Sequence, residues 1–194
     1  MRNISGAVRY KSKVELRKNF LKLLRNQTEE ERKVKSLAIY DKLFKMQEFQ
    51  RAITILFYAS FNGEVDTFEM MRQAQLLGKK IGLPRIDRRK KTITPVLVES
   101  LDDDLETGPY GIPQPAEKAG ALLSLQRLDM AIVPGVAFDK NNYRLGRGAG
   151  YYDMFLKTLP SGIPSIGLAF DFQIVDEFPL YENHDMPVSR VLVN

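Results

Sequence analysis

Three short apolar runs constrain the fold of this 194-residue chain more than any other feature. They are AITILFY (52–58), DMAIVPG (129–135) and PSIGLAF (164–170). A half-exposed strand alternates apolar and polar residues, and these runs show almost none of that alternation. They are therefore typical of strands that are covered on both faces, as in a parallel sheet between two layers of helices.

Two segments with helical spacing precede the first of these runs. Residues 12–25 place four apolar side chains on one helical face, namely Leu16, Phe20, Leu23 and Leu24. Thr28 and Glu31 then fit a capping box that opens a second helix. The residues of this second helix that we expect to face inward are Val34, Leu37, Ala38 and Phe44.

The rest of the chain repeats strand, loop and helix. We expect a helix from Asp66 or Thr67 to Leu77, ended by Gly78, and a short helix over YYDMFLKTL (151–159). Short strands are expected at 79–84 and 93–98, with an edge strand at 186–193. The connection 101–115 is rich in proline and glycine, which predicts no regular element there.

This recurrence predicts the α/β class, with a three-layer α/β/α architecture and a mainly parallel sheet. Ligands of such sheets bind beyond the carboxyl ends of the strands. Three stretches of the chain follow predicted strand ends and are therefore candidate sites: 59–67, 134–153 and 171–176.

Composition excludes several kinds of chemistry. The chain has no cysteine and a single histidine, His184, so thiolate nucleophiles, disulfides and histidine-cluster metal sites are ruled out. Any cation would be held by carboxylates, as Mg²⁺ usually is. No apolar run approaches the ~20 residues that span a bilayer, and the basic leader has no apolar core. We expect a cytoplasmic protein with no membrane partner.

The net charge of +5 is compatible with nucleic acid, a membrane surface or small polyanions as partners. Much of the charge lies in RIDRRKK (85–91), which reads most simply as a solvated hairpin. No RNA-binding signature with interleaved aromatic residues accompanies this run. Nucleic acid is therefore not the expected partner, although a nucleic-acid-binding α/β domain remains an alternative.

The stretch RLGRGAGYYD (144–153) fits neither standard nucleotide fingerprint. It lacks the Lys-Ser/Thr of a P-loop, and its glycines do not have the G-x-G-x-x-G spacing. Backbone N–H groups of a glycine-rich loop before a helix still suit phosphate oxygens, and Arg144 and Arg147 add planar donors. Asp153 could reach a cation on those phosphates. The alternative is a glycine turn in which Asp153 only favours a helix N-terminus.

Two further clusters could carry chemistry. Glu64, after the first predicted strand, could accept hydrogen bonds from a ring ligand, with Tyr58 and Phe61 stacking beside it. The alternative has Asp66 or Thr67 as a helix cap and Glu64 as an exposed loop residue. The second cluster precedes the last strand, where His184 is most simply structural and Asp185 is either a turn residue or a cation ligand.

Taken together and in order, these motifs resemble the 5-formyltetrahydrofolate cyclo-ligase family, also called methenyltetrahydrofolate synthetases. The matching motifs are KVELR (13–17), NGEVDT (62–67), LPR (83–85), YGIPQP (110–115), VPGVAFD (133–139) with RLGRGAGYYD, and HDMPV (184–188). The resemblance covers 13–194 as a single domain. It implies a Rossmann-like three-layer fold of the kind found in CoA transferases. It also implies ATP- and Mg²⁺-dependent cyclisation of 5-formyltetrahydrofolate to 5,10-methenyltetrahydrofolate, with release of ADP and phosphate.

The resemblance also implies a set of site residues. For ATP these are Lys13, Arg17, Arg144, Leu145, Gly146, Arg147, Gly148, Ala149, Gly150, Tyr151 and Tyr152. For the folate they are Arg17, Ala59, Glu64, Tyr110, Arg147, Gly148, Ala149, Gly150 and Tyr151. Asp153 and Asp185 would bind Mg²⁺, and Arg144, Arg147 and Tyr151 would take part in catalysis. Apart from the resemblance, we expect the basic residues RRKK (88–91) to lie near the polyglutamate tail of the folate.

Two departures from the family pattern stand out. Ala149 lies where the family usually has glycine or lysine, and its methyl group requires a negative φ. Ser189 lies where an acidic residue is common. Residues 1–12 have no counterpart, and a disordered leader is the expectation. We expect a monomer that binds a reduced folate and ATP, and the alternative within the family is a module that binds folate without turnover.

Overall fold

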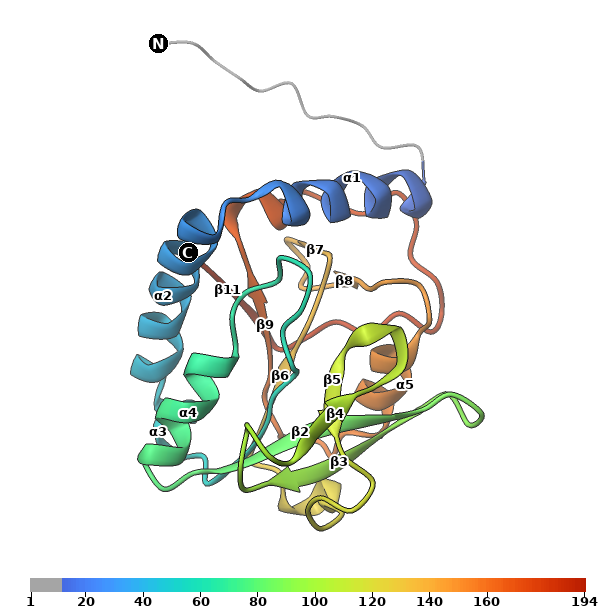
Figure 1. The fold of residues 1–194 in the computed structure, drawn as a ribbon. Helices are drawn as coiled ribbons and strands as arrows, with labels where there is room; N and C mark the ends of the chain where they lie inside the picture. The colour runs from blue at the N-terminus through green and yellow to red at the C-terminus, as the bar shows by residue number, and fades with distance from the viewer. Residues whose placement is uncertain (1–11) are drawn as a thin grey trace.

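A six-stranded sheet forms the centre of the computed structural model, which describes residues 12–194 (Figure 1). Its strand order is β11-β9-β6-β1-β2-β3, and all neighbouring strands are parallel except β2 and β3. The strands are β1 (Thr54–Leu56), β2 (Lys80–Asp87), β3 (Thr92–Val98), β6 (Met130–Val133), β9 (Ser165–Ala169) and β11 (Arg190–Val193). The three apolar runs thus form the neighbouring central strands β1, β6 and β9, and β11 is the predicted edge strand.

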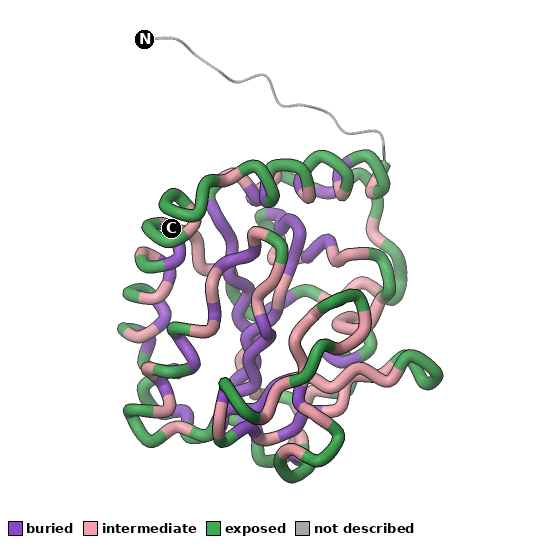
Figure 2. The backbone as a smooth tube through the Cα atoms, viewed as in Figure 1, coloured by how far each residue is buried: buried purple, intermediate pink, exposed green. Residues whose placement is uncertain are grey.

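Both faces of this sheet are buried, as the apolar runs predict. Successive residues of one strand enter different cores: Ile55 packs with the first four helices, whereas Leu56 packs with the last helix. The same division separates Ile132 from Val133 in β6. Figure 2 shows the buried strands at the centre and the exposed outer sides of the helices around them. The three-layer α/β/α prediction is confirmed.

Five α-helices surround the sheet in the described part of the chain, 12–194. They are α1 (Lys13–Asn26), α2 (Glu29–Lys45), α3 (Gln47–Arg51), α4 (Phe68–Leu76) and α5 (Tyr151–Thr158). The Thr28–Glu31 capping box is present at the start of α2, and Gly78 follows α4 with φ +77°. In Figure 1, α2, α3 and α4 lie on one side of the sheet, α5 lies on the other, and α1 crosses the end.

The inward face predicted for the second helix is wrong at two of its four residues, whereas Phe44 packs against the core as predicted. Val34 and Leu37 are 63% and 58% exposed, and the buried residues of α2 are Ser36, Ile39 and Leu43. Leu23 of α1 is also 44% exposed. Helical spacing allows several overlapping stripes, and the tilt at which α2 meets the sheet selects one of them.

The connection after β3 contains more structure than its composition predicts. Within 101–115, the strands β4 (Leu105–Thr107) and β5 (Pro113–Pro115) form an antiparallel pair around a 3₁₀ turn (Pro109–Gly111). A second small sheet has the order β10-β7-β8, with β7 (Ala137–Asp139), β8 (Arg144–Leu145) and β10 (Ile174–Val175). Two further 3₁₀ turns span Leu125–Arg127 and Asp171–Gln173. Both strands of the β4–β5 pair are edge strands, where proline is tolerated. Composition alone does not reveal this placement.

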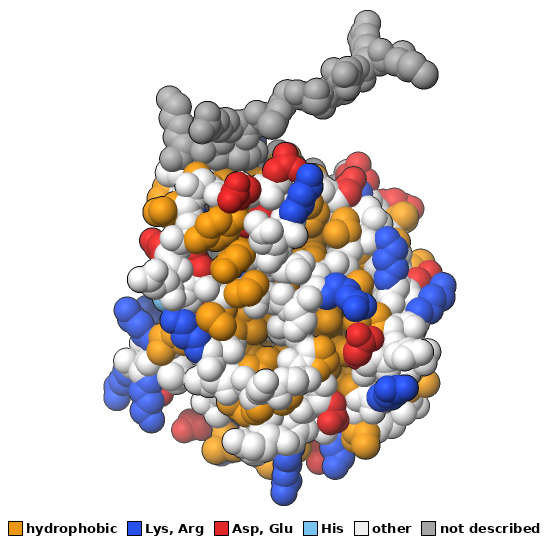
Figure 3. All heavy atoms as spheres, turned by 180° about the vertical axis from the view of Figure 1, so that it is seen from behind, with side chains coloured by type: hydrophobic (Ala, Val, Ile, Leu, Met, Phe, Trp, Pro, Cys, Tyr) orange, Lys and Arg blue, Asp and Glu red, His pale blue; other side chains and the backbone are white. Residues whose placement is uncertain are grey.

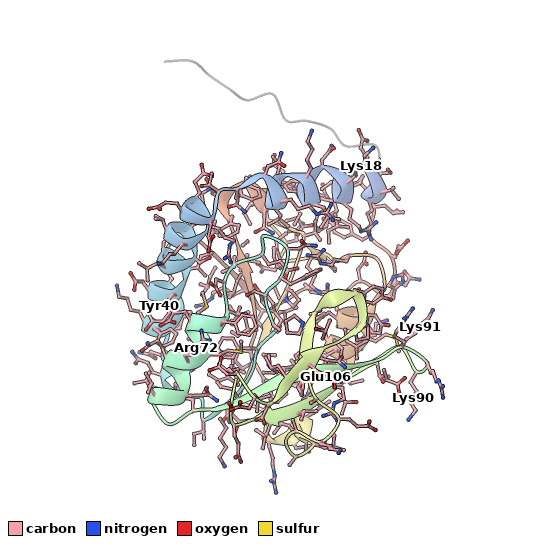
Figure 4. All side chains as sticks on the ribbon, viewed as in Figure 1. Lys18, Tyr40, Arg72, Lys90, Lys91 and Glu106 are labelled. Carbon is pink, nitrogen blue, oxygen red and sulfur yellow. The ribbon has the colours of Figure 1, made fainter. Side chains whose placement is uncertain are left out.

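The basic run 85–91 spans the end of β2 and the turn of the β2–β3 hairpin, so the predicted hairpin is confirmed. Lys90 and Lys91 lie at its tip and point away from the body of the molecule (Figure 4). Basic side chains gather at the corresponding edge of the surface in Figure 3. The disordered leader predicted for 1–12 lies outside the described residues except for Ser12, which caps α1. No helix in the described range 12–194 is long and apolar enough to span a bilayer.

Candidate active site

A pocket of about 560 Å³ lies beyond the carboxyl ends of β1 and β6. Every residue that the sequence assigns to ATP, the folate or Mg²⁺ lines it, from Lys13 and Arg17 in α1 to Asp185 near the C-terminus. Two of the three candidate stretches, 59–67 and 134–153, contribute to its wall, whereas 171–176 does not. The volume is within the usual range for small-molecule sites. The fold thus brings together segments that are far apart in the sequence.

The glycine loop owes its shape to two left-handed glycines. Gly148 and Gly150 have φ of +108° and +74°, and Gly150 directly precedes α5. Ala149, between them, is not among the residues with positive φ, so the alanine fits a position where the family usually has glycine or lysine. Arg17 reaches the loop from α1, where its Nε donates a 2.8 Å hydrogen bond to the Gly146 carbonyl.

Arg144 forms the buried base of this loop. Its side chain is 3% exposed, and Nη2 lies 2.8 Å from Asp153 Oδ1 in the first turn of α5. The guanidinium also lies over the Tyr152 ring, 5.5 Å from the ring centroid. Its Nε has no hydrogen-bond partner among the described residues. Burial lowers the pKa of Arg144, although Asp153 opposes that shift, and burial raises the pKa of Tyr152. A cation with an unpaired donor in a pocket is suited to bind an anion.

Arg147 joins the loop to the segment after β1. Its Nη2 and Nε donate hydrogen bonds of 2.8 and 3.2 Å to Glu64 Oε1, and its guanidinium lies 4.2 Å from the Phe61 ring centroid. Glu64 is 8% exposed, so the alternative of an exposed loop residue is wrong. Burial raises the pKa of the Glu64 carboxyl, while Arg147 partly counteracts the shift.

Asp66 and Thr67 have structural contacts, as the alternative interpretation proposed. Thr67 is the cap residue of α4, and its hydroxyl donates to the Tyr58 carbonyl at 2.6 Å. Asp66 accepts a hydrogen bond from the Phe68 amide and lies 3.7 Å from Arg32. Neither residue lines the pocket, which leaves Glu64 as the carboxylate that this segment presents to it.

A second group of charged side chains also lines the pocket and comes from α1 and the segment before β11. Lys13 of α1 forms an ion pair with Asp185 and lies 3.8 Å from Glu182, whose carboxylate lies 3.1 Å from His184 Nε2. The Asp185 pKa is lowered, because hydrogen bonds from the Glu182 amide and Lys13 together outweigh its burial. Ligand atoms of Glu182, His184 and Asp185 lie within 4.8 Å of one another, close enough for a shared cation.

Two tyrosines meet beside the glycine loop. Tyr151, the first residue of α5, lines the pocket together with Tyr110, and burial followed by the influence of Tyr110 raises the Tyr151 pKa. Tyr110 has φ +65°, an unusual conformation for a residue other than glycine. Arg88 from the basic hairpin lies over its ring at 5.4 Å. The hairpin therefore borders the pocket, and a contact with the folate tail stays a prediction.

Our reading of the sequence missed an apolar wall of the pocket. Gln114 lies beside its apolar residues, which come from β2, β3 and the segment around β5: Pro84, Ile86, Ile93, Ile112 and Pro113. The motif YGIPQP (110–115) was the available signal, but only its Tyr110 was assigned to the folate, because the irregular composition around it did not indicate a wall. This wall gives the pocket a surface suited to a flat ring, next to the charges of the loop.

The mainly parallel sheet, with a pocket and a cation-lined glycine loop beyond its strand ends, places this chain among α/β proteins that bind ligands at that edge of the sheet. A model of the 5-formyltetrahydrofolate cyclo-ligase family matches residues 9–194. The chain belongs to this family.

Similar proteins agree with that assignment. The chain is 31% identical to the probable 5-formyltetrahydrofolate cyclo-ligase of Caenorhabditis elegans, covering 93% of this chain and 91% of the relative. It is 32% identical to the 5-formyltetrahydrofolate cyclo-ligase of Mus musculus, with 91% of each chain covered. The 5,10-methenyltetrahydrofolate synthetase structure of Aquifex aeolicus aligns with TM-score 0.81 and 34% identity, over 93% of this chain and 89% of that one.

Proposed function

We propose that this chain converts 5-formyltetrahydrofolate into 5,10-methenyltetrahydrofolate, using ATP and Mg²⁺ and releasing ADP and phosphate. The observation that carries the proposal is the Arg147–Glu64 pair. It connects the glycine loop, which is suited to phosphate, with the segment after β1, which is suited to a ring ligand, and both line one pocket. The names of the C. elegans, mouse and A. aeolicus relatives support the same reaction. We also propose that the protein is a monomer and is located in the cytoplasm.

The chemistry of the substrate explains why ATP is needed. A formamide carbon is a poor electrophile because N5 donates electrons to it, and oxide is a very poor leaving group. Transfer of the γ-phosphoryl group to the formyl oxygen yields ADP and an iminium-like carbon. N10 then attacks this carbon, the C–O bond breaks, phosphate leaves with the formyl oxygen, and N10 loses its proton. Positioning and charge neutralisation are the enzyme's tasks, as in phosphoryl transfer generally.

The side chains of the pocket can be divided between these tasks. Lys13, Arg144 and Arg147, which all line the pocket, would neutralise the phosphates. Glu64 would accept hydrogen bonds from the N–H groups of the pterin. Tyr151 and the apolar wall would lie along the ring system, which excludes water from the iminium-like carbon.

The donors around the loop fit a hard cation. Asp153 and Asp185 supply carboxylate oxygens, the preferred ligands of Mg²⁺, and both line the pocket. These two residues would hold the ion, which would neutralise phosphate charge when bound. Each carboxylate now has a cationic partner, Arg144 and Lys13 respectively, so the side chains are already turned toward anion-binding groups.

A metal titration tests this assignment. Asp153→Asn should raise the Mg²⁺ concentration needed for half-maximal activity by at least about tenfold, the lower range for loss of a metal-supporting group. Asp176→Asn, at an exposed carboxylate paired with Lys140, is the control and should leave the titration unchanged. Identical titrations of Asp153→Asn and the wild type would contradict the ligand role.

The reaction itself is tested by adding 5-formyltetrahydrofolate and Mg-ATP and following the absorbance of the methenyl product with ADP release. Substrate labelled with ¹⁸O at the formyl oxygen should deliver the label to inorganic phosphate. Product without labelled phosphate would contradict phosphorylation of that oxygen. Tight folate binding without product would instead favour a folate-sequestering module, and steeply salt-dependent binding to random oligonucleotides would favour a nucleic-acid-binding domain.

A further inference from the structure

The first residue of the basic run differs from the other cations in it. Arg88, Arg89, Lys90 and Lys91 are exposed in the hairpin turn, whereas Arg85 is partly buried in β2, opposite Thr94 of β3. Arg85 also ends the LPR motif (83–85), and the proposed function gives this arginine no task. The contacts of this side chain are therefore informative.

The Arg85 guanidinium binds three backbone carbonyls of a neighbouring segment. Its Nε donates to the Pro115 carbonyl at 3.2 Å, and its Nη2 donates to the carbonyls of Ala116 and Ala119, the latter at 3.2 Å. Within residues 12–194, no carboxylate forms an ion pair with Arg85. A planar fork of donors can serve several carbonyls at once, which the single ammonium of lysine cannot reproduce.

These carbonyls belong to the end of the pocket wall. The chain from Tyr110 to Gln114 lines the pocket, and β5 continues directly into 115–119. The β4–β5 pair has three residues per strand, and a ladder of that length has little stability of its own. Its attachments to β2 are the Arg85 contacts and a 3.3 Å bond from the Ile86 amide to Gln114 Oε1.

We propose that Arg85 is a positioning residue that holds this wall, residues 110–119, against β2. The wall carries Tyr110, which lines the pocket together with Tyr151 at the start of α5, so its position sets the space available for a ring beside the glycine loop. The glycine loop has its own anchors in Arg17 and Glu64. Loss of Arg85 therefore impairs binding of the folate and leaves binding of ATP intact. This inference rests on the proposed function.

The test compares Arg85→Met and Arg85→Lys with Arg190→Met, which removes an exposed charge of β11 outside the pocket. Arg85→Met should raise the KM for 5-formyltetrahydrofolate by about tenfold, the scale of losing one or two net hydrogen bonds. The KM for ATP should stay within about twofold of the wild type, because uniform binding of ATP is untouched. Arg85→Lys should be intermediate, and Arg190→Met should match the wild type.

Hydrogen exchange supplies a readout that is independent of turnover. The amides of Ala116 and Ala119 are hydrogen-bonded, so exchange across 108–119 should accelerate in Arg85→Met and remain unchanged across 144–153. Equal changes in both KM values, or unchanged exchange across 108–119, would overturn the proposal. A wild type without turnover would refute the proposed function alone, and the exchange comparison would still decide whether Arg85 holds the wall.

Discussion

Arg144 and Arg147 lie three residues apart in one loop, and each pairs with a carboxylate, yet their surroundings differ. Arg144 and its partner Asp153 are 3% and 14% exposed, and the pair closes the loop onto the helix that follows it. Arg147 is 28% exposed, and it connects the loop with Glu64, 83 residues away. The comparison suggests that the inner pair holds the loop in the fold, whereas the outer pair joins the two sides of the site.

The largest expected effect is on the inner pair. Arg144→Met should lower the free energy of unfolding by about 3–5 kcal/mol, because removal of one partner leaves the largely buried Asp153 charge unpaired. Urea denaturation measures this change. Lys140→Met, which breaks an exposed pair with Asp176, should cost at most about 1 kcal/mol. Equal costs for the two variants would remove the structural distinction between inner and outer charges.

The outer pair should affect catalysis more than folding. Arg147→Ala should lower kcat/KM by about 2–4 kcal/mol in transition-state terms, comparable to the loss of an oxyanion-hole donor. Steady-state kinetics measures the change, with denaturation in parallel to show that the variant remains folded. Near-unchanged kinetics would remove Arg147 from the catalytic role and leave it as a structural link.

The two residues that follow Arg147 in the loop give a smaller effect. Gly148→Ala places a side chain at φ +108° and should cost about 1–3 kcal/mol of stability. Ala149→Gly should cost about 0.4–1 kcal/mol, because it only adds freedom to the unfolded chain. Denaturation of the two variants side by side tests whether the loop needs glycine at specific positions. A larger cost for Ala149→Gly would contradict the backbone conformation described here.

The smallest expected effect concerns how the free energy of unfolding depends on pH, to which Glu64 and Asp185 should contribute in opposite directions. The raised pKa of Glu64 means that the folded protein holds a proton there that the unfolded chain loses near pH 4.5. Its contribution to stability is therefore lost as pH rises from that value through the raised folded pKa, and Glu64→Gln should remove this decline.

Asp185 should show the opposite sign. Its pKa is lowered, so its contribution is present above the unfolded value of 3.8 and is lost as pH falls through the lowered folded value. Asp185→Asn should remove that loss. The free energy of unfolding, measured from acid to neutral pH, checks both variants. If the two side chains changed its pH dependence in the same direction, the opposite pKa shifts of Glu64 and Asp185 would be contradicted.

Many of the residues that line the pocket were predictable from the sequence, but the contacts between them were much less so. The motifs assign Glu64, Arg147 and Asp185 to one family pattern, and all of them line the pocket. The pattern does not show that Arg147 pairs with Glu64 or that Lys13 pairs with Asp185. Such pairs depend on distances between segments that are remote in the chain, and they form only when the strands bring those segments to one edge of the sheet.

The sequence by itself determined the α/β class, the central strands, the capped start of α2 and the glycine loop. Each of these follows from local patterns, such as apolar runs and capping residues, that act over a few neighbouring residues. Only the tertiary structure decided that Ile39 rather than Val34 faces the core, that the 101–115 segment forms a wall, and that Arg85 holds its end. These outcomes depend on how whole elements pack, because the tilt of a helix or the position of a short ladder is fixed by its neighbours and not by its own residues.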